Sequence, residues 1–218
     1  ELNPDGTPKQ DAEGNPIPTY DNDDITELAK VFTGLTYAGG QRNLDEFLYG
    51  EPVFTEPMVM YEPEHEFSDK RLPGGKVLFA GRDGMSDVRA AVDHLFQHPN
   101  VGPFIARRLI QRLVKSNPTP AYVARVAAAF ADDGQGVRGE MKAVIKAILL
   151  DAEARELSWM DDPAHGMLRE PFVRYTHLCR ALNATSPSGQ FRNFGWYADH
   201  TFKQHPMHAP SVFNFFLP

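Results

Sequence analysis

The chain has 218 residues, of which 42% are hydrophobic and 23% are charged, a composition typical of a globular protein with one sizeable core. Its formal net charge of -7 argues against a nucleic-acid-binding protein, because such proteins need a net basic face to displace counterions from phosphates. The single cysteine, Cys179, excludes an intramolecular disulfide, and no apolar run approaches the roughly 18 residues of a membrane-spanning helix.

The first 22 residues are rich in Pro, Gly, Asp and Asn, the residue types of tight turns. They hold too few β-branched residues for a stable strand, so we expect an extended arm or loose hairpin over residues 1–22. A single mainly helical domain is predicted over residues 23–218. The chain begins without methionine and ends in an apolar run, which we interpret as the two ends of a fragment of a larger protein.

The helical pattern begins near Asp23 or Asp24, either of which is a candidate cap for a first helix. Apolar residues then recur at i, i+3, i+4 and i+7, which places them on one helix face: Ile25, Leu28, Ala29 and Phe32. Residues 50–85 lack this pattern. They contain two short apolar runs, 58–61 and 76–79, which we expect to pair as a small β-hairpin.

Five further amphipathic helices are predicted, and they begin near Ser86, Asn100, Thr119, Met141 and Arg169. The last of them is expected to bury four side chains: Phe172, Tyr175, Leu178 and Leu182. Helices of about a dozen residues joined by short connectors favour antiparallel neighbours. The predicted fold class is therefore mainly α, an antiparallel helical bundle-like domain with a small β-hairpin and long irregular loops.

The densest polar cluster is the loop 65–70, which lies between the two predicted strands. It combines a possible base, two carboxylates and an amine: His65, Glu66, Asp69 and Lys70. Functional residues concentrate on loops held by rigid elements, so this loop is the best catalytic candidate. A solvated loop whose charges pair with one another is the alternative.

No metal site and no cofactor is predicted. His200, His205 and His208 match no structural-zinc spacing, and Pro206 prevents a regular helix there. The carboxylates of residues 21–24 lack the glycine and glutamate of a calcium loop. The chain also lacks a nucleophile elbow, a Walker loop and a dinucleotide fingerprint.

Two other features are candidate binding surfaces. A basic stripe is interpreted as the solvated face of a helix, with an acidic partner as the alternative: Arg107, Arg108, Arg112 and Lys115. The loop 184–199 carries four aromatic residues, Trp196 among them, and aromatic side chains in a loop must find a surface to cover.

Six segments carry motifs in the order of one known family: 24–34 (DITELAKVFTG), 65–70 (HEFSDK), 98–110 (HPNVGPFIARRLI), 120–126 (PAYVARV), 169–171 (REP) and 210–215 (PSVFNF). Together they resemble the domain-of-unknown-function 1800 family. The chain departs from the family pattern where Leu35 replaces a tryptophan and Glu66 an aspartate.

The resemblance implies a bacterial exported protein, periplasmic or secreted, and that this chain is the C-terminal half of one about twice as long. It also implies a sulfatase-like partner protein and contact with the N-terminal half of the same protein. A polysaccharide is the alternative partner, because the chain combines an aromatic loop with the absence of catalytic motifs. The family has no agreed activity. The matched motifs and the aromatic loop give five candidate binding residues: His98, Asn100, Arg169, Glu170 and Trp196.

Two functions follow as hypotheses. The first is a binding or scaffolding module for a protein or polysaccharide partner. The alternative is a hydrolase acting on an extracellular polymer, with His65 as base and Glu66 or Asp69 orienting it. The sequence leaves open whether the protein is an enzyme. A concave pocket that His65 and Lys70 share with His98 or Glu170 would favour the hydrolase.

Overall fold

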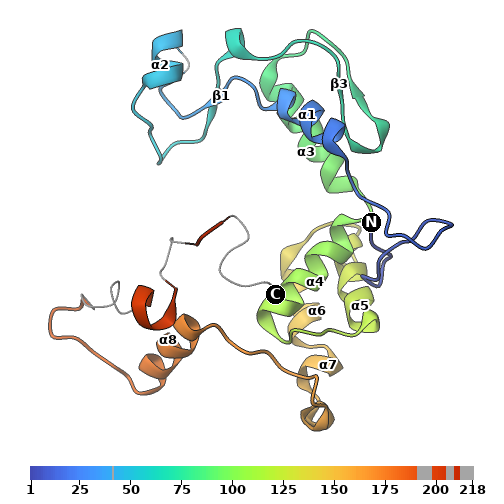
Figure 1. Cartoon of the computed structure of the whole chain (residues 1–218), viewed down its shortest axis with the longest axis vertical. Coiled ribbons are helices and arrows are strands. Elements are labelled where there is room, and N and C mark those ends of the chain that lie inside the picture. The colour runs from blue at the N-terminus through green and yellow to red at the C-terminus, as the bar shows by residue number, and fades with distance from the viewer. Residues whose placement is uncertain (41, 191–197, 205–208, 212–218) are drawn as a thin grey trace. The chain divides into compact units, whose positions relative to one another are not determined.

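The computed structural model describes residues 1–40, 42–190, 198–204 and 209–211 (Figure 1). The chain is 47% helix and 7% strand, which confirms the predicted mainly α fold class. It divides into two compact units, residues 1–105 and 106–218, called here the N-terminal and the C-terminal unit. The predicted division into an arm over residues 1–22 and a single domain over residues 23–218 stays a prediction.

The described residues of the N-terminal unit form three complete helices, four two-residue strands, two 3-10 turns and the start of a fourth helix. Their bounds are α1 (Asn22–Val31), β1 (Leu35–Thr36), α2 (Leu44–Tyr49), β2 (Val59–Met60), η1 (Glu62–Glu64), β3 (Lys70–Arg71), η2 (Pro73–Gly75), β4 (Val77–Leu78), α3 (Gly84–Gln97) and α4 (Val101–Leu113).

The C-terminal unit holds the rest of α4 and a series of shorter helical segments. Their bounds are α5 (Pro120–Ala131), α6 (Met141–Leu149), α7 (Ala152–Arg155), the 3-10 turn η3 (Leu157–Asp161), α8 (Pro171–Ala181) and the π-helical turn η4 (Ala198–Phe202).

The first 20 residues form two successive tight loops, closed by antiparallel bridges between Leu2 and Pro8 and between Gln10 and Pro16. The Leu2 backbone N–H donates to Asn100 Oδ1 at 2.6 Å, which ties the first loop to the residue before α4.

Helix α1 begins two residues earlier than the sequence pattern predicted. Asp21 is its N-cap and accepts from the Asp24 backbone N–H, while the Asp24 carboxylate accepts from the Asp21 N–H. This reciprocal pair is a capping box, so Asp24 serves as its third-position partner and not as the cap.

The core of the N-terminal unit lies where α1 packs against α3 and β3. Four buried apolar side chains form this core, from α1, from the residue after β3, from β4 and from α3: Val31, Leu72, Leu78 and Ala91. Leu28 and Val88 pack against this cluster from α1 and α3. Three of the four predicted members of the α1 face are instead exposed, because Val31 takes the buried position: Ile25 at 52%, Phe32 at 40%, and Ala29.

The predicted pairing of residues 58–61 with residues 76–79 is wrong. Strand β2 pairs with β1, with Leu35 opposite Met60, and β4 pairs with β3, with Lys70 opposite Leu78. The nearer pairing wins because Gly74 and Gly75 both adopt a positive φ, which closes a tight turn between β3 and β4.

Helices α5 and α6 pack side by side and form the core of the C-terminal unit (Figure 1). Thr119 caps α5 and Pro120 is its first residue, as predicted. The buried side chains are Tyr122, Val123, Val126, Ala127 and Phe130 of α5 with Val144 and Ile148 of α6.

The prediction that α8 buries one face is wrong. None of its residues is buried, and Leu178 and Leu182 are 57% and 72% exposed. Periodic spacing gave α8 an apolar stripe, but no described element covers that stripe enough to bury it.

Candidate functional site

The loop 65–70 closes over a buried carboxylate, Asp87 of α3, that the sequence analysis did not single out. The Asp87 side chain is fully buried, and its carboxylate contacts three nitrogen-bearing side chains. Lys70 Nζ lies 2.8 Å from Oδ2, His65 Nε2 lies 3.2 Å from Oδ2, and Arg82 Nε lies 2.7 Å from Oδ1. Two side chains of this loop, His65 and Lys70, are thus drawn inward to one ion cluster.

His65 has an acceptor in contact with each ring nitrogen. Nδ1 lies 2.9 Å from the Thr33 carbonyl oxygen, and Nε2 faces the Asp87 carboxylate. A carbonyl oxygen and an ionised carboxylate only accept, so both bonds form together only in the protonated ring. The ring edge also packs on Phe67, with centroids 5.4 Å apart.

The ion cluster favours the ionised form of Asp87. Burial by itself raises the pKa of the Asp87 carboxyl, but hydrogen bonds from Lys70, His65 and Arg82 outweigh burial and hold the pKa below its usual range. The cluster links the loop, β3 and α3 through one carboxylate. Its arrangement is that of a structural ion network, in which His65 and Lys70 are buried and the Arg82 side chain is 41% exposed.

The structure places the four predicted catalytic residues in two environments. His65 and Lys70 are 4% and 1% exposed and bind Asp87. Glu66 and Asp69 are exposed, and each accepts a backbone N–H of the loop region: Glu66 Oε1 from Ser68 at 2.9 Å, and Asp69 Oδ1 from Ala80 at 2.7 Å. The Ser68 N–H also lowers the pKa of Glu66. The four residues share no described pocket, and their catalytic role stays a prediction.

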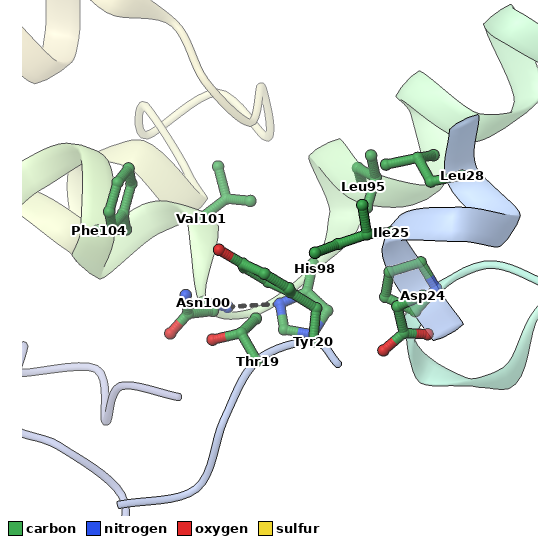
Figure 2. A pocket seen from close by; sticks show the side chains of 11 residues that line it. Thr19, Tyr20, Asp24, Ile25, Leu28, Leu95, His98, Asn100, Val101 and Phe104 are labelled. Atoms are coloured by element: carbon green, nitrogen blue, oxygen red, sulfur yellow. Dashed lines mark hydrogen bonds between the residues drawn. The ribbon is translucent and has the colours of Figure 1, made fainter. Parts of the chain in front are cut away.

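A separate apolar pocket of about 270 Å³ lies elsewhere in the N-terminal unit (Figure 2). Its walls come from residues that precede α1, from α1 and η2, from the end of α3 and from the start of α4. They are Thr19, Tyr20, Asp24, Ile25, Leu28, Pro73, Leu95, His98, Asn100, Val101 and Phe104. Most of the lining is carbon, with the few polar groups placed beside it.

Two of the predicted binding residues, His98 and Asn100, lie together at this pocket. The Asn100 backbone N–H donates to His98 Nδ1 at 3.2 Å, drawn as the dashed line in Figure 2. Asn100 Oδ1 accepts from Leu2, so the amide is held in one orientation. Figure 2 also shows the Tyr20 side chain between the α1 and α4 sides of the pocket.

The chain matches a family model described as a protein of unknown function (DUF1800) over residues 10–217. It belongs to the DUF1800 family. No curated protein and no solved structure matches the chain. In this DUF1800 chain the HEFSDK motif builds the ion cluster, and the HPN motif joins α3 to α4 beside the apolar pocket.

The remaining predicted binding residues belong to the C-terminal unit of the DUF1800 chain. Glu170 Oε1 accepts from Arg112 Nη1 at 3.3 Å, and both side chains are partly exposed. Arg169 is exposed. Trp196 and the other aromatic residues of the loop 184–199 lie outside the described residues, as do His205 and His208. The binding roles of these residues stay predictions.

The basic stripe of α4 is only partly a solvated face. Arg107, Arg108 and Arg112 are exposed, as interpreted from the sequence, but Lys115 is 1% exposed. Its Nζ lies 3.0 Å from Glu153 Oε1 and 4.7 Å from the centroid of the Trp159 ring. Lys115 follows the end of α4, where the chain turns and no longer keeps the register of the exposed stripe.

Glu153 is the centre of this second buried ion pair. Its carboxylate also accepts from the backbone N–H of Thr119 at 3.0 Å and from the Thr119 hydroxyl at 2.5 Å. Burial raises the pKa of the Glu153 carboxyl, but the hydrogen bonds from Thr119 and Lys115 outweigh it and lower the pKa. The pair joins α7 to the cap of α5.

The described part of the DUF1800 chain contains no group of three or more His, Cys, Asp or Glu side chains arranged to hold a metal ion. Within the same residues, no helix has the length and apolar character needed to cross a bilayer.

Proposed function

We propose that this DUF1800 chain is a binding module whose N-terminal pocket receives an apolar side chain of a protein partner. The observation that carries the proposal is the pocket itself, about 270 Å³ in volume and walled mostly by carbon. This volume lies just below the roughly 300–1,000 Å³ of small-molecule pockets, which suits a single side chain.

The exposure of the pocket walls supports the same function. Ile25 of α1 and Phe104 of α4 both line the pocket and are 52% and 45% exposed. Covering such surface on binding releases roughly 25 cal/mol for each Å² removed from water. An apolar anchor of a partner would therefore gain affinity here.

A protein partner is favoured over a polysaccharide for a chemical reason. A sugar buried against carbon walls leaves hydroxyl groups without hydrogen-bond partners, which costs free energy. Leu28, Leu95 and Val101 offer no such partners at the pocket. A polysaccharide is the alternative partner, and it would have to be bound by the polar lining residues Thr19, Tyr20, Asp24, His98 and Asn100.

The hydrolase hypothesis has less support. A general base must reach the proton it takes from substrate or water, and His65 is 4% exposed with both ring nitrogens already facing acceptors. We also propose, on the family resemblance, that the protein is exported from a bacterial cell and that a sulfatase-like protein and the N-terminal half of a longer chain are candidate partners.

The proposal is tested by selecting peptides on the purified chain from a randomised display library and measuring their affinities by fluorescence polarisation. The variant Ile25→Ser removes an apolar wall, and we expect roughly fivefold to thirtyfold weaker binding, equivalent to about 1–2 kcal/mol. Val92→Ser is the matched control, because Val92 is 51% exposed on α3 and does not line the pocket. Absence of selected peptides, or equal losses in both variants, contradicts the proposal.

A further inference from the structure

Negative charge is concentrated in the unit that contains the pocket. Residues 1–105 hold 19 Asp and Glu against 8 Lys and Arg, whereas the whole chain has 29 against 22. The N-terminal unit therefore has a formal charge of -11, and the C-terminal unit is net basic, which brings the charge of the whole chain to -7. A net field of one sign favours the approach of a partner of the other sign.

Most cations of the N-terminal unit are already used within it. Five of the eight form ion pairs inside the unit: Lys9, Lys30, Arg42, Lys70 and Arg82. Two of these five share the buried Asp87 and neutralise no surface carboxylate. The surface of the unit therefore keeps an excess of negative charge.

One carboxylate, Asp24, lines the pocket. Two exposed carboxylates are its neighbours along the chain: Asp21, the N-cap of α1, and Asp23 in the first turn. No Lys or Arg is among the residues that line the pocket. The helix N-terminus contributes only about half a positive charge against three carboxylates, so the rim is acidic. This acidic rim comprises Asp21, Asp23 and Asp24.

We infer that the occupant of the pocket is a basic peptide segment, in which an apolar side chain is flanked by Lys or Arg. The inference rests on the proposed function and adds the chemistry of the partner. The anchor enters between Ile25 and Leu95, whose side chains face each other across α1 and α3 in Figure 2. The flanking cations meet the acidic rim, which speeds association and selects against acidic segments.

The test uses three synthetic peptides with the same central Leu and with flanks of Lys, Ser or Glu, measured on the full chain by fluorescence polarisation. We expect the Lys-flanked peptide to bind most tightly and the Glu-flanked peptide least tightly. Each cation that meets the rim should increase the affinity roughly twofold to fivefold. Raising the salt concentration from about 50 mM to about 500 mM should weaken binding of the Lys-flanked peptide more than binding of the Ser-flanked peptide, because exposed charges are screened.

Two double variants separate the rim from the charge of the whole unit. Asp21→Asn with Asp23→Asn removes two rim charges while Asn keeps the cap of α1. Glu51→Gln with Glu56→Gln removes two exposed charges of the same unit that do not line the pocket. We expect the rim variant alone to lose most of the preference for Lys flanks.

Each outcome bears on a different statement. If the Ser-flanked peptide binds as tightly as the Lys-flanked one, or if both double variants lose the preference equally, the inference of a basic segment is overturned and the binding module stands. If no peptide binds whatever its flank, and the Ile25→Ser variant behaves like the native chain in the library selection, the proposed function itself is contradicted.

Discussion

The carboxylate of Asp87 and the ammonium of Lys70 lie 2.8 Å apart, and neither side chain is more than 2% exposed. The pair joins β3 to α3 at the edge of the core of the N-terminal unit. Removing two charges from water is costly, and the cost is offset only where further hydrogen bonds complete both groups. His65 and Arg82 complete Asp87, and the Ser68 carbonyl accepts from Lys70.

Replacing Asp87 with Asn should destabilise the protein strongly. The substitution keeps the shape of the side chain but leaves the buried Lys70 ammonium without a counterion, and breaking such a pair costs about 3–5 kcal/mol. The free energy of unfolding in urea measures the effect. Asp93→Asn is the control on the same helix, since Asp93 is exposed, and it should change stability by less than about 0.5 kcal/mol. Equal effects would contradict a stabilising role for the ion cluster.

The two buried carboxylates should make the protein lose stability in acid. The folded-state pKa values of Asp87 and Glu153 lie below their ordinary values, so the unfolded chain takes up protons first as the pH falls. Their contribution is fully present above the unfolded values of roughly 3.9 and 4.3, and it is lost as the pH falls through the lower folded values.

Urea unfolding at a series of pH values between neutral and about pH 3 measures this dependence. The Asp87→Asn variant should show a shallower fall in stability across the acid range than the native chain, because one of the two linked carboxyls is gone. Parallel curves for the two proteins would show that Asp87 does not titrate differently in the folded state.

Replacing Tyr122 with Phe should loosen the packing of α5 on α6. The buried Tyr122 hydroxyl donates to the Ile148 carbonyl oxygen at 2.6 Å, and burial also raises the pKa of this hydroxyl. Loss of the donor leaves a buried carbonyl acceptor without that bond, at about 1–3 kcal/mol. Thermal unfolding of Tyr122→Phe measures it, with Tyr49→Phe as control because Tyr49 is 82% exposed.

Two glycine substitutions should separate steric conflict from backbone strain. Gly34 and Gly39 both have a positive φ, of 79° and 95°. A Cβ at Gly34 would lie 2.7 Å from the Tyr61 carbonyl oxygen, whereas one at Gly39 would meet nothing within 4 Å. Gly39→Ala should therefore cost about 1–2 kcal/mol, the penalty of the left-handed region alone, and Gly34→Ala clearly more. Urea unfolding compares them, and equal losses would contradict the close approach of Gly34 to Tyr61.

Local chemistry in the sequence determined the helices of the C-terminal core. Thr119 followed by Pro120 marks a helix start, since the hydroxyl caps and Pro needs no backbone donor there. Val123, Val126 and Phe130 recur at helical spacing and are buried, because one face of α5 packs on α6. Both signals involve residues that are close together in the chain, so they can be recognised in the sequence directly.

A signal for the ion cluster was also present in the sequence. Asp87 lies four residues before Ala91, which the periodicity of α3 placed inward, so helical spacing put the carboxylate on the buried face. Because Asp residues are usually exposed, Asp87 was not predicted to be buried. His65 and Lys70 drew attention as a polar loop, but their shared partner is supplied by another element.

The mainly α class, the family and most helix starts of this chain can be predicted from its residues alone, because caps and periodicity act within a few residues. The strand pairing could not be predicted in this way, since two-residue strands carry no alternation that could specify a partner. The apolar pocket could not be predicted either, because it brings Tyr20, Leu95 and Phe104 together from three separate segments. Burial and proximity of such distant residues follow from packing, which no local pattern encodes.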